Sequence, residues 1–353
     1  MLLSCLVALG ASGADAQAPA KTDAADEAGF VSMFNGKDFS GWHFGGNSYA
    51  LPTEQQKVWA VGDGVIKQVF SAAKPQLLSQ WDYEDFELRL EWRVMAGEKD
   101  YNSGVFIRCT RDNEKANQIN LKKGGEGELV NPKVKGSKAI PELLKPSKEW
   151  NEWCVRAVGD KISLTCNGKP AWDVTGYKSL SGCIGLQAEY FPFEFRNLRI
   201  KDLGYEALNN PAAWATKGWS LSGDALVAGG ATEPLVSKAS DYKDYRLRLE
   251  WRAAKDGNKG ALYLRGPKAA AAAVALGAGG GDGPLGQKAP KNPDNPVGQW
   301  NYLDATVQAG KAKIWLNGVV LAENVALEQA SGAFSLSTGL EYRNIRVKRL
   351  DAK

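Results

Sequence analysis

The sequence contains one eleven-residue pattern twice, and this repeat constrains the fold more than any other feature. YEDFELRLEWR at Tyr83 to Arg93 returns as YKDYRLRLEWR at Tyr242 to Arg252, with eight of eleven letters identical. In each copy large apolar residues alternate with charged residues, which is the period-two pattern of a β-strand that is buried on one face. The chain is therefore expected to contain two related β-rich units.

Three further matched blocks follow this strand and extend the repeat. They pair Asn102 to Arg108 with Asn258 to Arg265, Trp150 to Gly168 with Trp300 to Gly318, and Ser181 to Leu203 with Ser331 to Leu350. Blocks that recur in the same order indicate a tandem duplication. We expect a first domain at residues 29–204 and a second, degenerate copy at residues 205–353.

Short alternating strands separated by turn residues indicate an all-β protein. Turn sequences such as Gly62-Asp63-Gly64 divide the strands, as is typical of antiparallel sandwiches. Helices are expected only as short segments, at Ile140 to Leu144 and at Lys268 to Leu276. With 353 residues and 44% hydrophobic content, the chain can build two cores of ordinary domain size.

The charge of the chain argues against nucleic acid as a partner. The formal net charge of +4 is spread along the sequence rather than gathered in a basic helix or arm. Twelve Trp and eleven Tyr offer aromatic faces on which sugar rings can stack, although Trp residues buried in sandwich cores account for many of them as well. The expected partner is a small-molecule carbohydrate, and the sequence predicts no oligomeric state.

The N-terminal residues are expected to direct export. Met1 to Gly10 is apolar but too short to span a bilayer, and Ala14 to Ala16 fits a cleavage site, so residues 1–16 are predicted to be a signal peptide. Residues 17–28 lack an apolar period and are predicted to be a disordered leader. The expected location is periplasmic or extracellular, and a lipoprotein attached through Cys5 is the alternative if the true start lies upstream. No other stretch predicts a transmembrane segment.

Four cysteines follow the predicted leader, namely Cys109, Cys154, Cys166 and Cys183. A two-residue turn at Gly159-Asp160 would place Cys154 and Cys166 on opposite faces of one hairpin, which argues against a disulfide between them. Domains of this size do not need disulfides, so buried free thiols are favoured.

The chain contains a single histidine, which limits the kinds of active site it can form. His43 lies beside Trp42 and is interpreted as structural, which excludes Ser-His-Asp triads, Cys-His dyads and multi-histidine zinc sites. No glycine-rich phosphate loop supports NAD or ATP as a cofactor. No ligand spacing identifies a metal either, although a divalent cation held by carboxylate and amide oxygens stays open. Carboxylate, arginine and amide chemistry remains.

Six segments of the first copy together resemble a known family. They are Phe34 to Trp42, Asp85 to Arg93, Asn102 to Arg108, Trp150 to Trp153, Cys166 to Gly168 and Gly185 to Ile200. In order and spacing they are similar to the bacterial 3-keto-disaccharide hydrolase family, over Phe30 to Leu203 and more weakly over Trp219 to Leu350. The resemblance implies concanavalin A-like jelly rolls, here two in tandem, with the ligand on a concave sheet.

Comparison of the two copies separates residues of the fold from candidates for a site. Glu91, Arg93 and Arg108 recur in the second copy, so ion pairs on the sheet would explain them as well. By contrast, the polar residues of Gln187 to Tyr190 and of the long Thr110 to Glu149 connection have no counterpart there. Connections of that length in a compact domain are usually functional or disordered. The site is therefore expected in the first copy.

The resemblance implies an enzyme that acts on 3-keto-disaccharides or other 3-keto-glycosides, as a hydrolase or as a lyase. The ketone at C3 acidifies the proton on C2, so a base can remove this proton and the glycosidic oxygen can leave. The candidate catalytic residues are Glu91 and Glu189 as base and acid in either order, with Arg93 and Arg108 at the developing oxyanion. The candidate substrate-binding residues are Asn102, Gln118, Asn120, Gln187 and Tyr190.

Two positions depart from the family. A glutamate two residues before Gln118 and a histidine after Gln187 commonly belong to the family's site, and here these positions are Ala116 and Glu189. The alternative function is a non-catalytic, lectin-like carbohydrate-binding protein, because the same fold serves both. Catalysis is favoured if Glu91 and Glu189 point into one pocket about 5–10 Å apart. Binding is favoured if Glu189 faces bulk solvent.

Overall fold

A computed structural model gives the architecture. It describes residues 28–45, 58–69, 76–95, 100–112, 117–189, 191–266, 272–277 and 293–350. The predicted signal peptide, the leader up to residue 27, Ala116 and Tyr190 lie outside the described residues. Among the helices that are described, none is long and apolar enough to cross a membrane.

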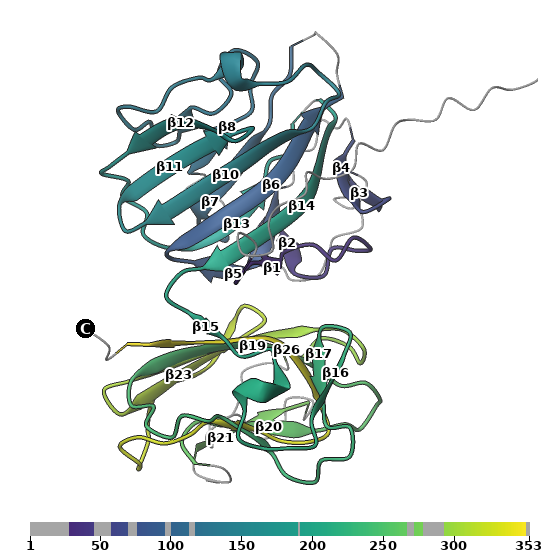
Figure 1. Ribbon diagram of the computed structural model, residues 1–353, viewed down its shortest axis with the longest axis vertical. Helices are drawn as coiled ribbons and strands as arrows, with labels where there is room; N and C mark the ends of the chain where they lie inside the picture. The colour runs from purple at the N-terminus through teal and green to yellow at the C-terminus, as the bar shows by residue number, and fades with distance from the viewer. Residues whose placement is uncertain are drawn as a thin grey trace, which may run out of the picture.

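Two antiparallel β-sandwiches follow each other along the chain (Figure 1). Each packs a larger sheet against a smaller one, and nearly all regular structure in the described ranges is strand. The protein is thus an all-β chain of two tandem concanavalin A-like jelly rolls, as the sequence predicts.

The larger sheet of the first sandwich contains β6, the strand predicted from the repeat. In spatial order its strands are β12 (Lys169–Val174), β11 (Lys161–Cys166), β10 (Asn151–Val158), β6 (Phe86–Val94), β14 (Phe193–Asp202), β4 (Val65–Gln68) and β3 (Trp59–Gly62), and β1 (Val31–Ser32) also pairs with β14. Leu88, Leu90 and Trp92 of β6 are buried in the core, and the charged residues between them lie on the outer face. The alternation confirms the predicted strand.

The smaller sheet of the first sandwich supplies the other half of the core. In spatial order its strands are β2 (Trp42–Phe44), β5 (Leu77–Tyr83), β13 (Gly182–Leu186), β7 (Gly104–Cys109), β8 (Gln118–Asn120) and β9 (Leu129–Val130). Its core residues include Trp42, Phe44, Leu77, Val105, Ile107, Ile119, Ile184 and Leu186. Because successive side chains in a strand point to opposite faces, the residues between them lie on the outer face.

The second sandwich repeats this arrangement and occupies the lower half of Figure 1. Its larger sheet contains β16 (Ser220–Ser222), β17 (Ala225–Val227), β26 (Glu341–Arg349), β19 (Tyr245–Arg252), β22 (Asn301–Gln308), β23 (Lys311–Leu316) and β24 (Val319–Ala326), and β15 (Glu206–Ala207) also pairs with β26. Its smaller sheet contains β18 (Leu235–Val236), β25 (Ser335–Leu336), β20 (Gly260–Tyr263) and β21 (Ala273–Leu276).

The two predicted helices have different outcomes. The segment at Ile140 to Leu144 contains a single 3-10 turn, η2 (Pro141–Leu143), and a second such turn, η3 (Pro211–Ala213), follows the first sandwich. The prediction of a helix in the Ala-rich segment was wrong for its last part, which is strand β21. Pairing with β20 buries Val274 and Leu276 in the core, and this burial outweighs the helical preference of alanine.

The cysteine prediction is confirmed. Val158 pairs with Lys161 across the predicted two-residue turn, so Cys154 and Cys166 lie on opposite faces of the β10–β11 hairpin. All four cysteines after the leader are free thiols, and all are buried as predicted except Cys154, which is partly buried.

One end of the first sandwich, where β5 and β14 finish, packs on the outer face of the larger sheet of the second. The Trp81 ring of β5 lies 5.8 Å from the Tyr302 ring and 6.0 Å from the Trp315 ring, centroid to centroid. Trp300 and Tyr302 of the second sandwich belong to the core cluster of the first. The two sandwiches therefore share apolar contacts as well as a linker.

Ion pairs surround these aromatic contacts. Asp202, at the end of β14, accepts hydrogen bonds from Arg248 at 2.9 Å and from Arg346 at 3.0 Å, and all three side chains are nearly fully buried. Glu84 accepts from Arg246 at 2.6 Å and from Lys348 at 3.0 Å. Charged groups of the second copy are thus neutralised by carboxylates of the first.

Candidate functional site

One row of residues crosses the outer face of the smaller sheet in the first sandwich. The register places His43 opposite Leu78, Leu78 opposite Gly185, Gly185 opposite Phe106, and Phe106 opposite Gln118. Directly opposed residues of antiparallel strands share a face. The lone histidine and the predicted substrate-binding residue Gln118 therefore belong to the same face of this sheet.

At the Gln118 end of this row, polar side chains form a chain of hydrogen bonds. The Gln118 Nε2 group donates to Gln187 Oε1 at 2.8 Å, and Gln187 Nε2 donates to Glu189 Oε1 at 3.2 Å. Asn120 pairs with Gly104 in the next register position and lies on the same face. We call Gln118, Asn120, Gln187 and Glu189 the amide cluster. It unites one carboxylate with three side-chain amides.

The backbone around the amide cluster is fixed by buried polar groups that the sequence analysis missed. Gln68 Nε2 donates to the backbone oxygen of Glu189 at 2.6 Å, and Ser103 Oγ donates to the backbone oxygen of Gln187 at 2.8 Å. Gln68 lies in β4 of the larger sheet, so its contact joins the two sheets beside the site. Only the register of the strands, which no motif reveals, brings these residues together.

A glycine makes the close packing of Gln118 possible. A β-carbon added to Gly104 would lie 2.2 Å from Gln118 Nε2 and 2.5 Å from Gln118 Cδ, far inside van der Waals contact. The Gln118 side chain thus lies directly over the β7 backbone, where its Nε2 group also donates to the Ser103 oxygen at 3.0 Å. Asn102 precedes Gly104 by two residues, so the strand alternation favours the same face for it.

Apolar side chains form the part of this face next to the amide cluster. Leu78, Phe106, Cys109 and Cys183 pack into a separate buried cluster. Burial, with the positive charge of Arg111 as a second cause, lowers the pKa of His43 to about 3. The imidazole is therefore neutral at physiological pH, and Glu189 is the titratable carboxylate of the amide cluster.

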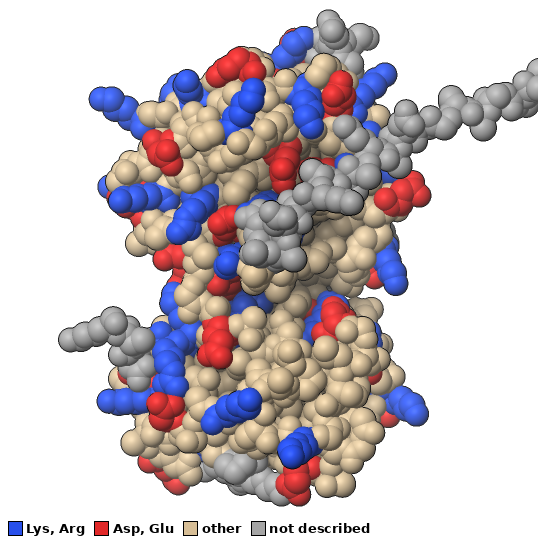
Figure 2. Space-filling model, in the orientation of Figure 1, with Lys and Arg blue, Asp and Glu red and all other residues tan. Residues whose placement is uncertain are grey.

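Glu91 and Arg93 lie on the other side of the sandwich. Both belong to the outer face of β6 in the larger sheet, whereas the amide cluster lies on the outer face of the smaller sheet. Figure 2 shows cationic and anionic side chains intermixed over the upper sandwich. The structure does not bring Glu91 and Glu189 into one pocket. Glu189 is 7% exposed, so it does not face bulk solvent either.

The contacts of Glu91 recur in the second copy. Glu91 accepts hydrogen bonds from Arg196 Nε and Asn197 Nδ2, and Glu250 accepts the same two bonds from Arg343 and Asn344. Asn197 and Asn344 both have positive φ, at a register shift in β14 and β26 respectively. A contact set present in both copies fits a role in holding a β-bulge.

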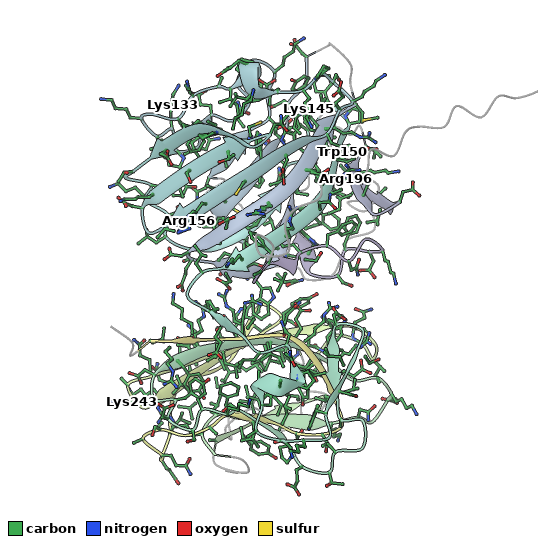
Figure 3. All side chains as sticks on the ribbon, in the orientation of Figure 1. Lys133, Lys145, Trp150, Arg156, Arg196 and Lys243 are labelled. Atoms are coloured by element: carbon green, nitrogen blue, oxygen red, sulfur yellow. The ribbon has the colours of Figure 1, made fainter. Side chains whose placement is uncertain are left out.

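Arg93 has a matching counterpart as well. It pairs with Glu194 and lies over the Trp150 ring, which Arg196 also contacts at 4.1 Å from the ring centroid (Figure 3). In the second copy, Arg252 and Arg343 contact Trp300 in the same way, at 4.6 Å and 4.0 Å. These arginines stack on tryptophan on the outer face of each larger sheet.

The candidate Arg108 does not lie with the amide cluster. Strand alternation from Phe106 would put both side chains on one face, but Arg108 has a φ of 49°, which interrupts this alternation. Its buried guanidinium instead donates to the backbone oxygens of Glu84 at 2.7 Å, Gly159 at 2.6 Å and Ser179 at 3.0 Å. Arg108 thus joins the β7 strand to a turn of the opposite sheet, away from the amide cluster.

The part of the chain that the structure describes offers few ligands for a metal. It holds no group of three or more His, Cys, Asp or Glu side chains that could bind an ion. The amide cluster offers one carboxylate and neutral amide oxygens, whereas protein calcium sites take six to eight oxygen ligands. This donor set does not fit a dedicated cation site, so no step is derived through a cation.

Comparison with known proteins assigns the chain to a protein family. The family described as the 3-keto-alpha-glucoside-1,2-lyase-like domain matches the chain in two segments, residues 29–201 and 207–348. The chain belongs to this family. The predicted resemblance is thereby confirmed, and each sandwich carries one match to the lyase-like domain. The positions of Gln187 and Glu189 in the first lyase-like domain are Ser337 and Gly339 in the second.

One curated relative and several solved structures are similar to parts of this lyase-like chain. A 3-keto-disaccharide hydrolase of Bacteroides thetaiotaomicron is 31% identical over 88 residues, which is 23% of this chain and 28% of that protein. A provisionally named glycosyl hydrolase of Parabacteroides distasonis has 21% identity and a TM-score of 0.37, covering 49% of this chain and 99% of its own. The carbohydrate binding module CBM66 of Bacillus subtilis has 14% identity and a TM-score of 0.36, covering 48% and 99% respectively.

Proposed function

We propose that the first lyase-like domain cleaves 3-keto-glycosides and that its amide cluster is the active site. The observation that carries this proposal is the hydrogen-bonded chain from Gln118 through Gln187 to Glu189. It joins one carboxylate to side chains that can hold sugar hydroxyls, and the second domain lacks it. Membership of the lyase-like family supports the same reaction class.

The proposed reaction needs only one carboxylate. Glu189 takes the proton from C2 of the 3-keto sugar, and the electron pair of that C–H bond forms the enolate of the C3 ketone. When the enolate collapses, the bond from C1 to the glycosidic oxygen breaks and a C1–C2 double bond forms. The protonated Glu189 then returns its proton to the leaving oxygen. Addition of water to C1 would complete a hydrolysis.

In this scheme the amide side chains hold the Glu189 carboxylate in position. Gln187 donates to Glu189 Oε1, which fixes the orientation of the carboxylate that takes the C2 proton. Gln118 is itself held over β7 by its bonds to Gln187 and to the Ser103 backbone. A base that is held in position before substrate binds loses less entropy on reaching the reactive geometry.

The test is turnover by the purified full-length protein of a 3-keto-disaccharide, compared with the same disaccharide unoxidised. We expect cleavage of the oxidised sugar alone. Glu189→Gln keeps the size of the side chain and removes its titratable group, and it should lower kcat by ~10²- to 10⁴-fold with an unchanged thermal midpoint. Glu152→Gln is the matched control, since Glu152 lies on the larger sheet and pairs with Arg199 at 3.3 Å.

A second function, carbohydrate binding without catalysis, is favoured by the composition of the amide cluster, because three of its four side chains are amides that cannot transfer protons. Turnover that survives Glu189→Gln unchanged would remove the proton-transfer role. Binding of the 3-keto-disaccharide without any cleavage by the wild-type protein would replace the enzyme by the binding protein.

A further inference from the structure

A cleft of about 380 Å³ lies between the two sandwiches. Its lining residues from the first sandwich are Trp81, Asp82 and Arg111. Its lining residues from the second include Arg246, Asp304, Lys313 and Trp315, all on the larger sheet. The cleft exists only where the two copies meet, and it is separate from the amide cluster.

The residues that the second copy contributes to this cleft differ from their counterparts in the first copy. In the aligned repeats, Arg246 stands where the first copy has Glu87, and Asp304 stands where it has Cys154. Lys313 replaces Ser163, and Trp315 replaces Thr165, in the same alignment. The outer face of this sheet therefore differs between the copies at the positions that line the cleft. The second copy lacks the polar residues of the amide cluster, but it supplies charged and aromatic residues to the cleft.

The aromatic part of the cleft is formed by one tryptophan from each copy. The Trp81 and Trp315 rings lie 6.0 Å apart at an interplanar angle of 40°, and Trp315 is only partly buried. Trp81 is 5% exposed, and its indole Nε1–H group has no hydrogen-bond acceptor among the described residues. Because that group is buried, the partly exposed Trp315 ring is the aromatic surface that the cleft offers, and the Arg111 guanidinium lies 4.9 Å from its centroid.

The charged part of the cleft carries donors and acceptors together. Arg246 donates to both oxygens of Asp304 at 2.9 Å, and Arg111 donates to Asp82 at 3.0 Å. The pairs neutralise one another, which disfavours a strongly charged ligand. Paired arginines and carboxylates still offer further N–H groups and lone pairs to vicinal hydroxyls, which donate and accept at once.

We propose that this interdomain cleft is a second saccharide-binding site, for a neutral sugar of one or two pyranose rings. The apolar face of the sugar ring packs on the exposed part of the Trp315 indole, beside the Arg111 guanidinium. The hydroxyls bond to Thr306, to the arginine–aspartate pairs and to Lys313, whose ammonium group also pairs with Glu323 at 2.8 Å. The volume lies in the range of small-molecule sites. The second copy thus contributes a binding site while the first contributes the amide cluster.

Isothermal titration calorimetry of the full-length protein with maltose tests this proposal, with sorbitol as a polyol that has hydroxyls but no ring face. We expect maltose to bind with a millimolar Kd and sorbitol to show no heat. Trp315→Ala should raise the Kd for maltose about tenfold. Lys313→Ala should raise it about threefold to tenfold, with little effect on folding because Lys313 is exposed.

The matched control is Lys311→Ala, since Lys311 is an exposed lysine two residues away on the same strand and does not line the cleft. It should bind maltose like the wild type. Glu189→Gln should also bind like the wild type, because the amide cluster is a different site. The proposal is overturned if maltose does not bind, if sorbitol binds equally well, or if Glu189→Gln rather than Lys313→Ala weakens binding. None of these outcomes depends on whether 3-keto-glycosides are cleaved.

Discussion

Asp202 is the residue on which the coupling of the two sandwiches depends most. It belongs to the first copy, and its Oδ2 atom accepts from Arg248 at 2.9 Å and from Arg346 at 3.0 Å, both of the second copy. The side-chain exposures are 3% for Asp202, 1% for Arg248 and 7% for Arg346. Asp202→Ala would leave the Arg346 guanidinium without its carboxylate and Arg248 with Asp304 alone, at 2.8 Å.

The size of the effect follows from this burial. Breaking a buried ion pair by removing one partner costs about 3–5 kcal/mol, because the remaining charge stays buried. For domains of this size, each kcal/mol shifts the thermal midpoint by about 2–4 °C, so we expect a fall of about 6–20 °C. Asp202→Asn should show most of this loss, since the amide keeps the volume but not the charge.

Differential scanning calorimetry measures this prediction, because it also shows whether the sandwiches unfold together or separately. Asp224→Ala is the control. Asp224 also pairs with an arginine of β26, Arg343 at 2.9 Å, but its side chain is 69% exposed. Exposed pairs contribute about 0–1 kcal/mol, so the control should shift the midpoint by no more than about 4 °C. Equal midpoints for the Asp202 and Asp224 variants would refute the reasoning.

Three further predictions concern other parts of the chain. Glu91→Gln should lower the free energy of unfolding in urea by about 2–4 kcal/mol, because Glu91 holds a β-bulge. It should change kcat less than about threefold. A large loss of kcat at unchanged stability would instead support a catalytic role for Glu91. Gly104→Ala should displace Gln118 and lower kcat about tenfold or more, whereas Gly62→Ala, whose added β-carbon meets only the flexible end of a lysine at 3.5 Å, should not. Burial alone would raise the pKa of Asp304, but the guanidinium groups of Arg248 and Arg246 lower it overall. Its stabilising contribution is therefore present above the unfolded value of about 3.9 and lost as pH falls through the lower folded value. Thermal midpoints should drop below about pH 4 in the wild type and less steeply in Asp304→Asn.

The strands that carry a clear alternation were predictable from the sequence. β6 and β19 show it in eleven-residue segments, and the β3–β4 hairpin follows from its turn residues. The alternation also assigns Glu91 and Arg93 to one face, but it does not say which face of a sandwich carries a ligand. Only the pairing of distant strands separates them from the amide cluster.

The errors came from local conformations that side-chain patterns do not encode. A single positive φ at Arg108 turns its side chain inward, and no residue type near it predicts this. In the alanine-rich segment, composition favoured a helix, but the edge of β20 was available for pairing and β21 formed there. Gln68, which donates to the backbone oxygen of Glu189, lies 121 residues away from it along the chain.

The contact between the sandwiches joins two different surfaces of related domains. The strand ends of one copy meet the sheet face of the next, which is a head-to-tail arrangement rather than a symmetric one. Head-to-tail contacts between identical units can repeat without limit and produce filaments, unless something closes or ends the series.

Here each copy has kept only one half of the contact. Ser79 Oγ donates to the Trp81 oxygen, and Ser237 Oγ donates in the same way to the Ala239 oxygen, so Ala239 is the counterpart of Trp81 in the second copy. Glu84 has Lys243 as its counterpart, so the second copy presents no matching end. On the other half, Tyr302 of the second copy corresponds to Glu152 in the first, which places a charge where an aromatic ring would have to dock. The residues that make this contact between the two copies are therefore not repeated on the opposite surface of either copy.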